Sequence, residues 1–342
     1  MADATRPRRA AGLLRSTAWS AVDFWTQQAG ALLTFIIVGN LIGPAAVGVL
    51  TIGQLAVTLM MSLLLDGFSD ALIQRQKLEP THFATAFWLL AGCGLATALL
   101  LWAAAPALAA LFAEPELSHV LPLLAIGLPF VGIGAACQGL LPRELRFGTL
   151  ALRSVVAQAA GFGCALAMAR AGQGALSLVG YFVVARVLDA ALLLALSRRW
   201  PGLGVSRAAL ADIVGFGKHR VGNQLAGFVV MQVDRFSVGF FLGAAAVGLY
   251  SVAERITGAL TNGLGGVIGR VGFPAFSARQ GDTAEFQQAV GDFLAATNLL
   301  TVPVFVGLAL VGGDLVRVLF SPAWSSAAWP LAVLALAATP FT

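Results

Sequence analysis

Apolar segments long enough to cross a membrane follow one another along almost the whole chain. A spanning helix needs about 20 mostly apolar residues. Ten stretches meet or approach that length: 18–41, 47–70, 83–105, 118–141, 149–169, 174–196, 214–242, 246–274, 288–312 and 327–342. Short links separate these stretches, and the longest polar link runs from Ser197 to Asp212. The pattern predicts an all-α membrane protein with ten spans and no loop that could hold a soluble catalytic domain.

The composition agrees with this pattern. Of the 342 residues, 58% are hydrophobic and only 11% are charged, whereas soluble domains carry about 25% charged residues. The mean hydropathy is +0.86. The basic N-terminus followed by an apolar run is similar to a signal peptide, but the run is long and contains polar residues such as Asp23. We therefore expect an uncleaved first span.

Basic residues gather on alternate links between the expected spans. Cytoplasmic loops of membrane proteins collect Lys and Arg, so this alternation predicts a cytoplasmic N-terminus. The net charge of +5 is spread over many links, and we expect no nucleic acid as a partner. The residues that set the orientation are Arg6, Arg8, Arg9, Arg15, Arg75, Lys77, Arg143, Arg146, Arg198, Arg199 and Arg207.

Residues that could support a metal centre or catalysis are few and scattered. Cys93, Cys137 and Cys164 each lie in an apolar run, and the three histidines show no spacing typical of metal ligands. The chain carries no hydrolase, metalloprotease or phosphate-loop motif. We expect no cofactor, no metal site and no enzymatic activity.

One short motif occurs twice. The segment GNLIGPAAVG (Gly39–Gly48) and the segment GFFLGAAAVG (Gly239–Gly248) match at six of ten positions with an offset of 200 residues. Each copy links two consecutive expected spans, and six spans separate the copies, so both have the same orientation. This predicts two parallel halves related by an axis along the membrane normal, as in transporters built from two six-helix halves.

The repeat predicts the division of the chain. Residues 1–17 form a cytoplasmic N-terminus, 18–197 a first six-helix bundle, 198–213 a cytoplasmic linker and 214–342 a second bundle. The expected fold is two parallel-related six-helix bundles around a central cavity. Because residues 214–342 hold only four expected spans, the second bundle is expected to be truncated.

Several stretches carry a resemblance to a known family. They are LIGPAAVGVLTIGQ, DGFSDALIQRQ, LFAEPELSHVLPLLAIGLPF, LPRELRFGTLALR, IVGFGKHRVGNQL, VDRFSVGFFLGAAAVGLYSVAERI, GRVGFPAFSARQGD and LFSPAW. In this order, and over nearly the whole chain, they resemble the polysaccharide flippases of the multidrug/oligosaccharidyl-lipid/polysaccharide exporter superfamily. Members of that family usually have twelve or more spans.

The resemblance implies a flippase that moves undecaprenyl-pyrophosphate-linked oligosaccharides outward across the bacterial inner membrane, for lipopolysaccharide or exopolysaccharide biosynthesis. Its implied partners are the lipid-linked oligosaccharide, membrane lipids, and the polymerase and glycosyltransferases of the same machinery. Two alternatives stay open. One is a drug or cation antiporter of the same superfamily, and the other is a membrane scaffold of the assembly machinery that does not transport.

Charged side chains inside a span cost about 2.5–3.5 kcal/mol on insertion scales, so they mark candidate sites. At about 1.5 Å of rise per residue, two charged pairs lie at similar depth on either side of the second motif copy. We expect ion pairs between Asp234 and Arg255 and between Arg235 and Glu254. Their role is open between a structural clasp and pyrophosphate binding by the planar arginine fork.

Three further residues are candidates for the same cavity: Asp23, Gln27 and Asn223. Amides suit sugar hydroxyls, and Asp23 would face water in the first span. For each of them, hydrogen bonding between helices is the alternative interpretation. Asp66 and Asp189 are interpreted as residues near the cytoplasmic ends of their helices.

Overall fold

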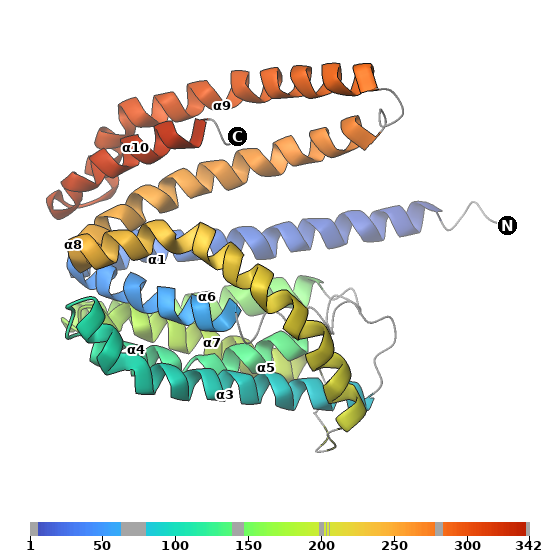
Figure 1. Ribbon diagram of the computed structural model, residues 1–342, viewed down its shortest axis with the longest axis vertical. Helices are drawn as coiled ribbons and strands as arrows, with labels where there is room; N and C mark the ends of the chain where they lie inside the picture. Colours follow the sequence, from blue (N-terminus) through green and yellow to red (C-terminus); the bar gives the residue numbers. More distant parts are fainter. Residues whose placement is uncertain are drawn as a thin grey trace. The chain divides into compact units, whose positions relative to one another are not determined.

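The computed structural model describes residues 6–62, 80–138, 147–197, 202, 204, 206–277 and 283–339. Side chains are described for most of these residues, but not for several stretches that include 6–25, 211–223 and 266–277. Every regular element within these ranges is helical (Figure 1). In chain order the elements are α1 (Arg6–Met61), α3 (Pro80–Leu111), α4 (Leu117–Ala125), α5 (Leu128–Gln138), α6 (Phe147–Arg170), α7 (Leu176–Ser197), α8 (Arg207–Ser277), α9 (Thr283–Leu319), η3 (Pro322–Ala327) and α10 (Ala328–Ala338).

Seven helices in the described ranges are long and apolar enough to cross a membrane. This confirms the expected all-helical, multi-pass membrane protein. Two of the seven contain a glycine break, and a shorter apolar segment follows them. The count of ten spans expected from the sequence stays a prediction. The seven are Thr26–Met61, Phe83–Leu111, Leu117–Cys137, Ala151–Arg170, Leu176–Leu196, Gln224–Gly265 and Gln287–Leu319, and the shorter segment is Pro322–Ala338.

The repeated motif recurs in the backbone. In α1, Gly43 has φ 83° and ψ 171°, and in α8, Gly243 has φ 78° and ψ −179°. Residues with a Cβ rarely adopt this region, so glycine is required at both positions. Figure 1 shows the chain of α1 reversing direction at its break. The two motif copies therefore have nearly the same backbone conformation at their glycines, as expected for a repeated turn.

The chain divides into two compact units, Met1–Ala244 and Ala245–Thr342. In the first unit α6 packs along α7 and α1, and α3 packs on α4 and α5. The approach of α5 to α3 is close, because a Cβ on Gly132 would lie 2.2 Å from the carbonyl oxygen of Leu90. Small residues permit such contacts between membrane helices. The division at residues 198–213 expected from the sequence stays a prediction.

Two hydrogen bonds tie the segment before α8 to the beginning of α3. The indole Nε1–H of Trp88 donates to the carbonyl of Gly202 at 3.0 Å. The backbone N–H of Ser206 donates to Oγ1 of Thr85, also at 3.0 Å. These contacts fix where α8 starts within the first unit.

In the second unit α10 and η3 pack on α9. Trp324 is fully buried and its ring lies 5.4 Å from that of Phe320. A Cβ on Gly312 of α9 would lie 2.9 Å from a methyl group of Leu331. The sequence LFSPAW therefore forms a compact turn that returns the chain onto α9.

Candidate functional site

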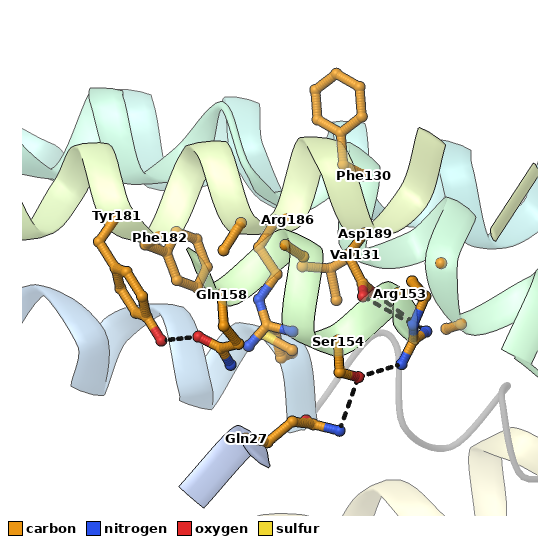
Figure 2. A pocket seen from close by; sticks show the side chains of 15 residues that line it. Gln27, Phe130, Val131, Arg153, Ser154, Gln158, Tyr181, Phe182, Arg186 and Asp189 are labelled. Atoms are coloured by element: carbon orange, nitrogen blue, oxygen red, sulfur yellow. Dashed lines mark hydrogen bonds and ion pairs between the residues drawn. The ribbon is translucent and has the colours of Figure 1, made fainter. Parts of the chain in front are cut away.

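A cavity of about 280 Å³ lies among α1, α5, α6 and α7 of the first unit (Figure 2). Its wall is polar although the four helices belong to segments that are long and apolar enough to cross a membrane. Since polar and ionisable side chains inside a membrane are costly, they mark functional positions. The polar lining residues are Gln27, Arg153, Ser154, Gln158, Tyr181, Arg186 and Asp189.

An ion pair between α6 and α7 forms one wall of the cavity. Nε of Arg153 lies 3.2 Å from Oδ1 of Asp189, and Nη1 of the same arginine donates to Oδ2 at 3.5 Å. The side chain of Arg153 is 2% exposed and that of Asp189 is 23% exposed. A buried guanidinium needs a compensating charge. Asp189 supplies that charge and fixes the direction of the arginine.

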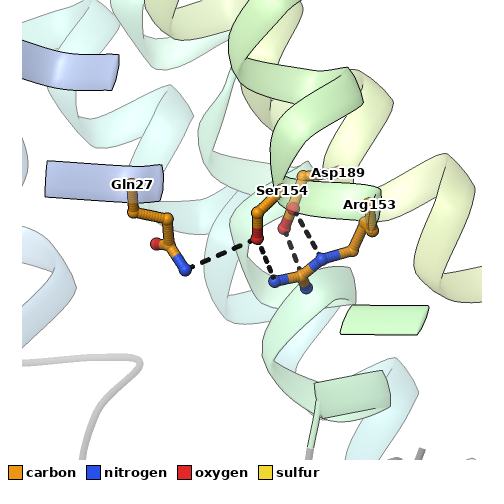
Figure 3. A network of polar contacts seen from close by, with 4 residues as sticks. All are labelled: Gln27, Arg153, Ser154 and Asp189. Carbon is orange, nitrogen blue, oxygen red and sulfur yellow. Dashed lines mark hydrogen bonds and ion pairs between the residues drawn. The ribbon is translucent and has the colours of Figure 1, made fainter. Parts of the chain in front are cut away.

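The ion pair continues into a network that joins three helices (Figure 3). Nη2 of Arg153 donates to Oγ of Ser154 at 3.2 Å. Nε2 of Gln27, on α1, donates to the same oxygen at 3.5 Å. On another part of the wall the hydroxyl of Tyr181 donates to Oε1 of Gln158. These hydrogen bonds connect α1 and α7 to α6 through polar groups that line the cavity.

Arg186 is the second cation of the lining. Its guanidinium carbon lies 5.4 Å from the centre of the Phe182 ring, a cation–π arrangement. Figure 2 shows the guanidinium reaching toward Gln158. Among the lining residues that the structure describes there are two arginines and one aspartate, and hence one excess positive charge. This cavity can bind an anionic group through arginine and hydroxyl groups through its amides and hydroxyls.

The predicted site residues fall in different places. Gln27 lines the cavity, and so does Asp189, whose interpretation as a residue near a helix end missed its pairing with Arg153. The side chains of Asp23 and Asn223 lie outside those that the structure describes.

The charged residues of the second motif copy lie on α8. The carboxylate of Asp234 accepts the backbone N–H of Arg235 at 2.8 Å, and Nη1 of Arg235 donates to Gln232 at 3.0 Å. Glu254 and Arg255 are half-buried in the second unit. The expected pairs of Asp234 with Arg255 and of Arg235 with Glu254 would join the two units, and they stay predictions.

Five polar lining residues were not among the sequence candidates: Arg153, Ser154, Gln158, Tyr181 and Arg186. A signal for them is present in the sequence. Ser154 and Gln158 are four residues apart on one apolar helix, and Tyr181, Ala185 and Asp189 keep the same spacing on the next. Positions four apart share a helix face. A search for polar stripes on apolar helices would have found this cavity.

The chain was compared with known protein families and curated proteins. A family model described as polysaccharide biosynthesis protein matches residues 37–329. The lipopolysaccharide biosynthesis protein WzxC of Escherichia coli is 23% identical over 310 residues, covering 90% of this chain and 63% of that protein. The teichuronic acid biosynthesis protein TuaB of Bacillus subtilis is 26% identical over 282 residues, covering 82% and 58%. The succinoglycan biosynthesis transport protein ExoT of Rhizobium meliloti is 26% identical over 325 residues, covering 94% and 65%. The chain thus spans less than two thirds of the length of these relatives.

Among solved structures, an inward-facing multidrug resistance transporter of the MATE family, in the MOP superfamily, matches with a TM-score of 0.57. It is 17% identical and the match covers 94% of this chain and 79% of that one. At this identity the match shows the fold alone. The expectation of a transport protein rather than an enzyme agrees with these matches. The polar cavity therefore lies in a multi-pass membrane protein with a MATE-like fold, and the chain belongs to the polysaccharide biosynthesis protein family.

Proposed function

We propose that this protein is a flippase that moves undecaprenyl-pyrophosphate-linked oligosaccharides outward across the bacterial inner membrane, with its N-terminus in the cytoplasm. The observation that carries the proposal is the polar cavity with its buried arginine inside spanning helices. Relatives named for lipopolysaccharide biosynthesis and for succinoglycan transport support the choice of a glycan as cargo. For the whole transporter we propose two parallel six-helix bundles around a central cavity.

The chemistry of the cavity suits such a cargo. A lipid-linked oligosaccharide presents a pyrophosphate and many hydroxyl groups. Arg186 supplies a guanidinium for an anionic oxygen, and Gln158 and Ser154 supply groups that hydrogen-bond to hydroxyls. Asp189 holds Arg153 until an anionic group competes for the same guanidinium. This competition gives the site a way to bind the cargo and then to release it.

The pairing inside the cavity discriminates against the antiporter alternative. A drug or cation antiporter needs an acidic group that is available to a cation. In the described lining the single acidic residue, Asp189, lies 3.2 Å from Arg153, and the excess charge is positive. Both features favour an anionic cargo over a cationic one.

A deletion and complementation experiment tests the function. Deleting the gene should make lipid-linked repeat units accumulate on the cytoplasmic side, and the wild-type gene should restore export. Unchanged surface polysaccharide in a deletion strain without a paralogue would refute the flippase proposal.

A matched pair of substitutions tests the site. Arg186→Gln should lower export roughly tenfold or more, because charge-assisted hydrogen bonds contribute about 1.5–3 kcal/mol. Arg170→Gln makes the same change at an exposed residue in the last turn of α6 and should leave export unchanged. Both proteins must accumulate at the wild-type level in the membrane. Equal export by the two variants would show that Arg186 does not hold the cargo.

A further inference from the structure

The turn between α3 and α4 meets the break in α8. Oε1 of Glu114 accepts a hydrogen bond from the backbone N–H of Ala244 at 3.1 Å. Beside it, the ring of Phe112 packs edge-on against that of Phe236, with centroids 5.5 Å apart. All four residues belong to the first unit. Contacts from one short turn therefore hold α8 where its helix is interrupted.

The first motif copy contacts Ala244 from another side. A Cβ on Gly48 would lie 1.7 Å from the carbonyl oxygen of Ala244, so only glycine allows this approach. Ala244 thus has its N–H bound to Glu114 and its carbonyl oxygen against the backbone of α1. The two copies of the repeated motif meet at this residue.

The break explains why Ala244 needs an acceptor from elsewhere in the chain. Gly243 leaves the helical conformation, so the N–H of Ala244 is the first of a new helical limb and has no acceptor within it. A carboxylate is a favourable acceptor at that end of a helix because it also complements the helix dipole. Glu114 supplies it from 130 positions away in the sequence.

The first motif copy needs no such acceptor. Its equivalent position is Pro44, which follows a glycine of nearly the same backbone conformation. Proline has no N–H and is well suited to the first position of a helix. The duplicated turn is therefore closed by proline in α1 and by Glu114 in α8.

We propose that Glu114 is the side chain that holds the start of the second limb of α8 at the Gly243 break. Its carboxylate takes the place of the proline that closes the equivalent turn in α1. Loss of the hydrogen bond should therefore loosen the first turn of that limb. This inference concerns α8 alone and does not depend on the identity of the cargo.

The two motif copies supply the variants for a test on the purified full-length chain. Ala244→Pro removes the donor while keeping a backbone that Gly43 and Pro44 already adopt. Glu114→Ala removes the acceptor, and Glu114→Gln keeps an acceptor oxygen. Glu116→Gln changes an exposed acid two residues further along the same turn and is the control.

Two measurements follow. Hydrogen–deuterium exchange in the peptide after Gly243 should rise several-fold in Glu114→Ala. With proline at position 244, which closes the turn as Pro44 does in α1, the same Glu114→Ala change should cause no rise. Exchange should stay at the wild-type level in Glu116→Gln and close to it in Glu114→Gln. Glu114→Ala should also lower the Tm by roughly 3 °C, because it leaves the buried N–H of Ala244 without its acceptor. In the background of Ala244→Pro the same change should have no effect on the Tm, because no donor remains.

Two results would overturn the proposal. If exchange in Glu114→Ala stays at the wild-type level, the hydrogen bond does not hold the start of this limb. If Glu114→Ala lowers the Tm equally with alanine or proline at position 244, Glu114 acts through another contact.

Discussion

Removing the carboxylate of Asp189 is the most direct test of the cavity's structure. At the observed N–O distance of 3.2 Å, the attraction between the two charges is about 5 kcal/mol for an effective dielectric constant of ~20. Asp189→Ala leaves the guanidinium of Arg153 buried, at 2% exposure, without its counter-charge. Breaking a buried ion pair in this way costs about 3–5 kcal/mol. We therefore expect a large loss of stability from the single substitution.

The assay is thermal unfolding of the purified protein in detergent at one fixed heating rate, because such unfolding is often irreversible. For domains of 150–250 residues 1 kcal/mol shifts the Tm by about 2–4 °C, so the expected loss is on the order of 10 °C. The control is Asp314→Ala on α9. Its partner Arg317 lies 3.3 Å away, and the two side chains are 74% and 77% exposed. Exposed pairs contribute little, so the control should keep the wild-type Tm.

A double variant separates pairing from packing. Arg153→Met with Asp189→Leu removes both charges, and apolar replacement of a buried ion pair is often neutral or stabilising. The double variant should therefore recover most of the Tm that Asp189→Ala loses. Equal Tm values for Asp189→Ala and Asp314→Ala, or a double variant no more stable than the single one, would refute the assignment of a compensated buried charge.

Three other outcomes are expected. Gly132→Ala should lower the Tm, because the added Cβ would lie 2.2 Å from the backbone of Leu90. In the control Gly92→Ala the added Cβ meets no atom within 4 Å, so the Tm should not change. Equal effects of the two substitutions on the Tm would contradict the close helix contact. Tyr181→Phe should cost about 0.5–1.5 kcal/mol of stability through its lost bond to Gln158 and should lower export, and wild-type behaviour in both assays would contradict its role. Reporter fusions after Ala45, Glu116 and Ala245 should report the periplasm, and fusions after Lys77, Arg146 and Arg207 should report the cytoplasm. A cytoplasmic signal from Ala245 would contradict the parallel repeat.

The sequence predicts the helices and the two turns well because both depend on local properties. Helix length follows from the run of apolar residues that a bilayer requires. The conformations of Gly43 and Gly243 follow from the absence of a Cβ, and the matching flanks showed that the two turns are equivalent. Neither inference needs to know which helix packs against which.

The cavity depends on information of another kind. Gln27 and Ser154 are 127 positions apart, and Arg153 and Asp189 are 36 apart. Their meeting depends on the rotation of each helix about its axis, which an apolar sequence specifies weakly. The adjacent charges Asp234–Arg235 and Glu254–Arg255 stood out in the sequence, whereas Arg153 and Arg186 did not, and Asp189 was interpreted as a residue near a helix end. Glu114 was missed for the same reason, because an acid in a polar turn is ordinary until the break in α8 is placed beside it.

The energetics of the cavity argue that its charges serve a purpose other than folding. Each ionised side chain within a span costs about 2.5–3.5 kcal/mol on insertion scales, and a buried pair is often no better than apolar residues of similar volume. Stability alone therefore does not explain Arg153 and Asp189 on the wall of a cavity that also holds Arg186. If the pair exists to exchange with an anionic cargo, the double variant Arg153→Met, Asp189→Leu should fold and accumulate normally but lose export. If the double variant accumulates at the wild-type level and exports at the wild-type rate, the pair of Arg153 and Asp189 does not take part in transport.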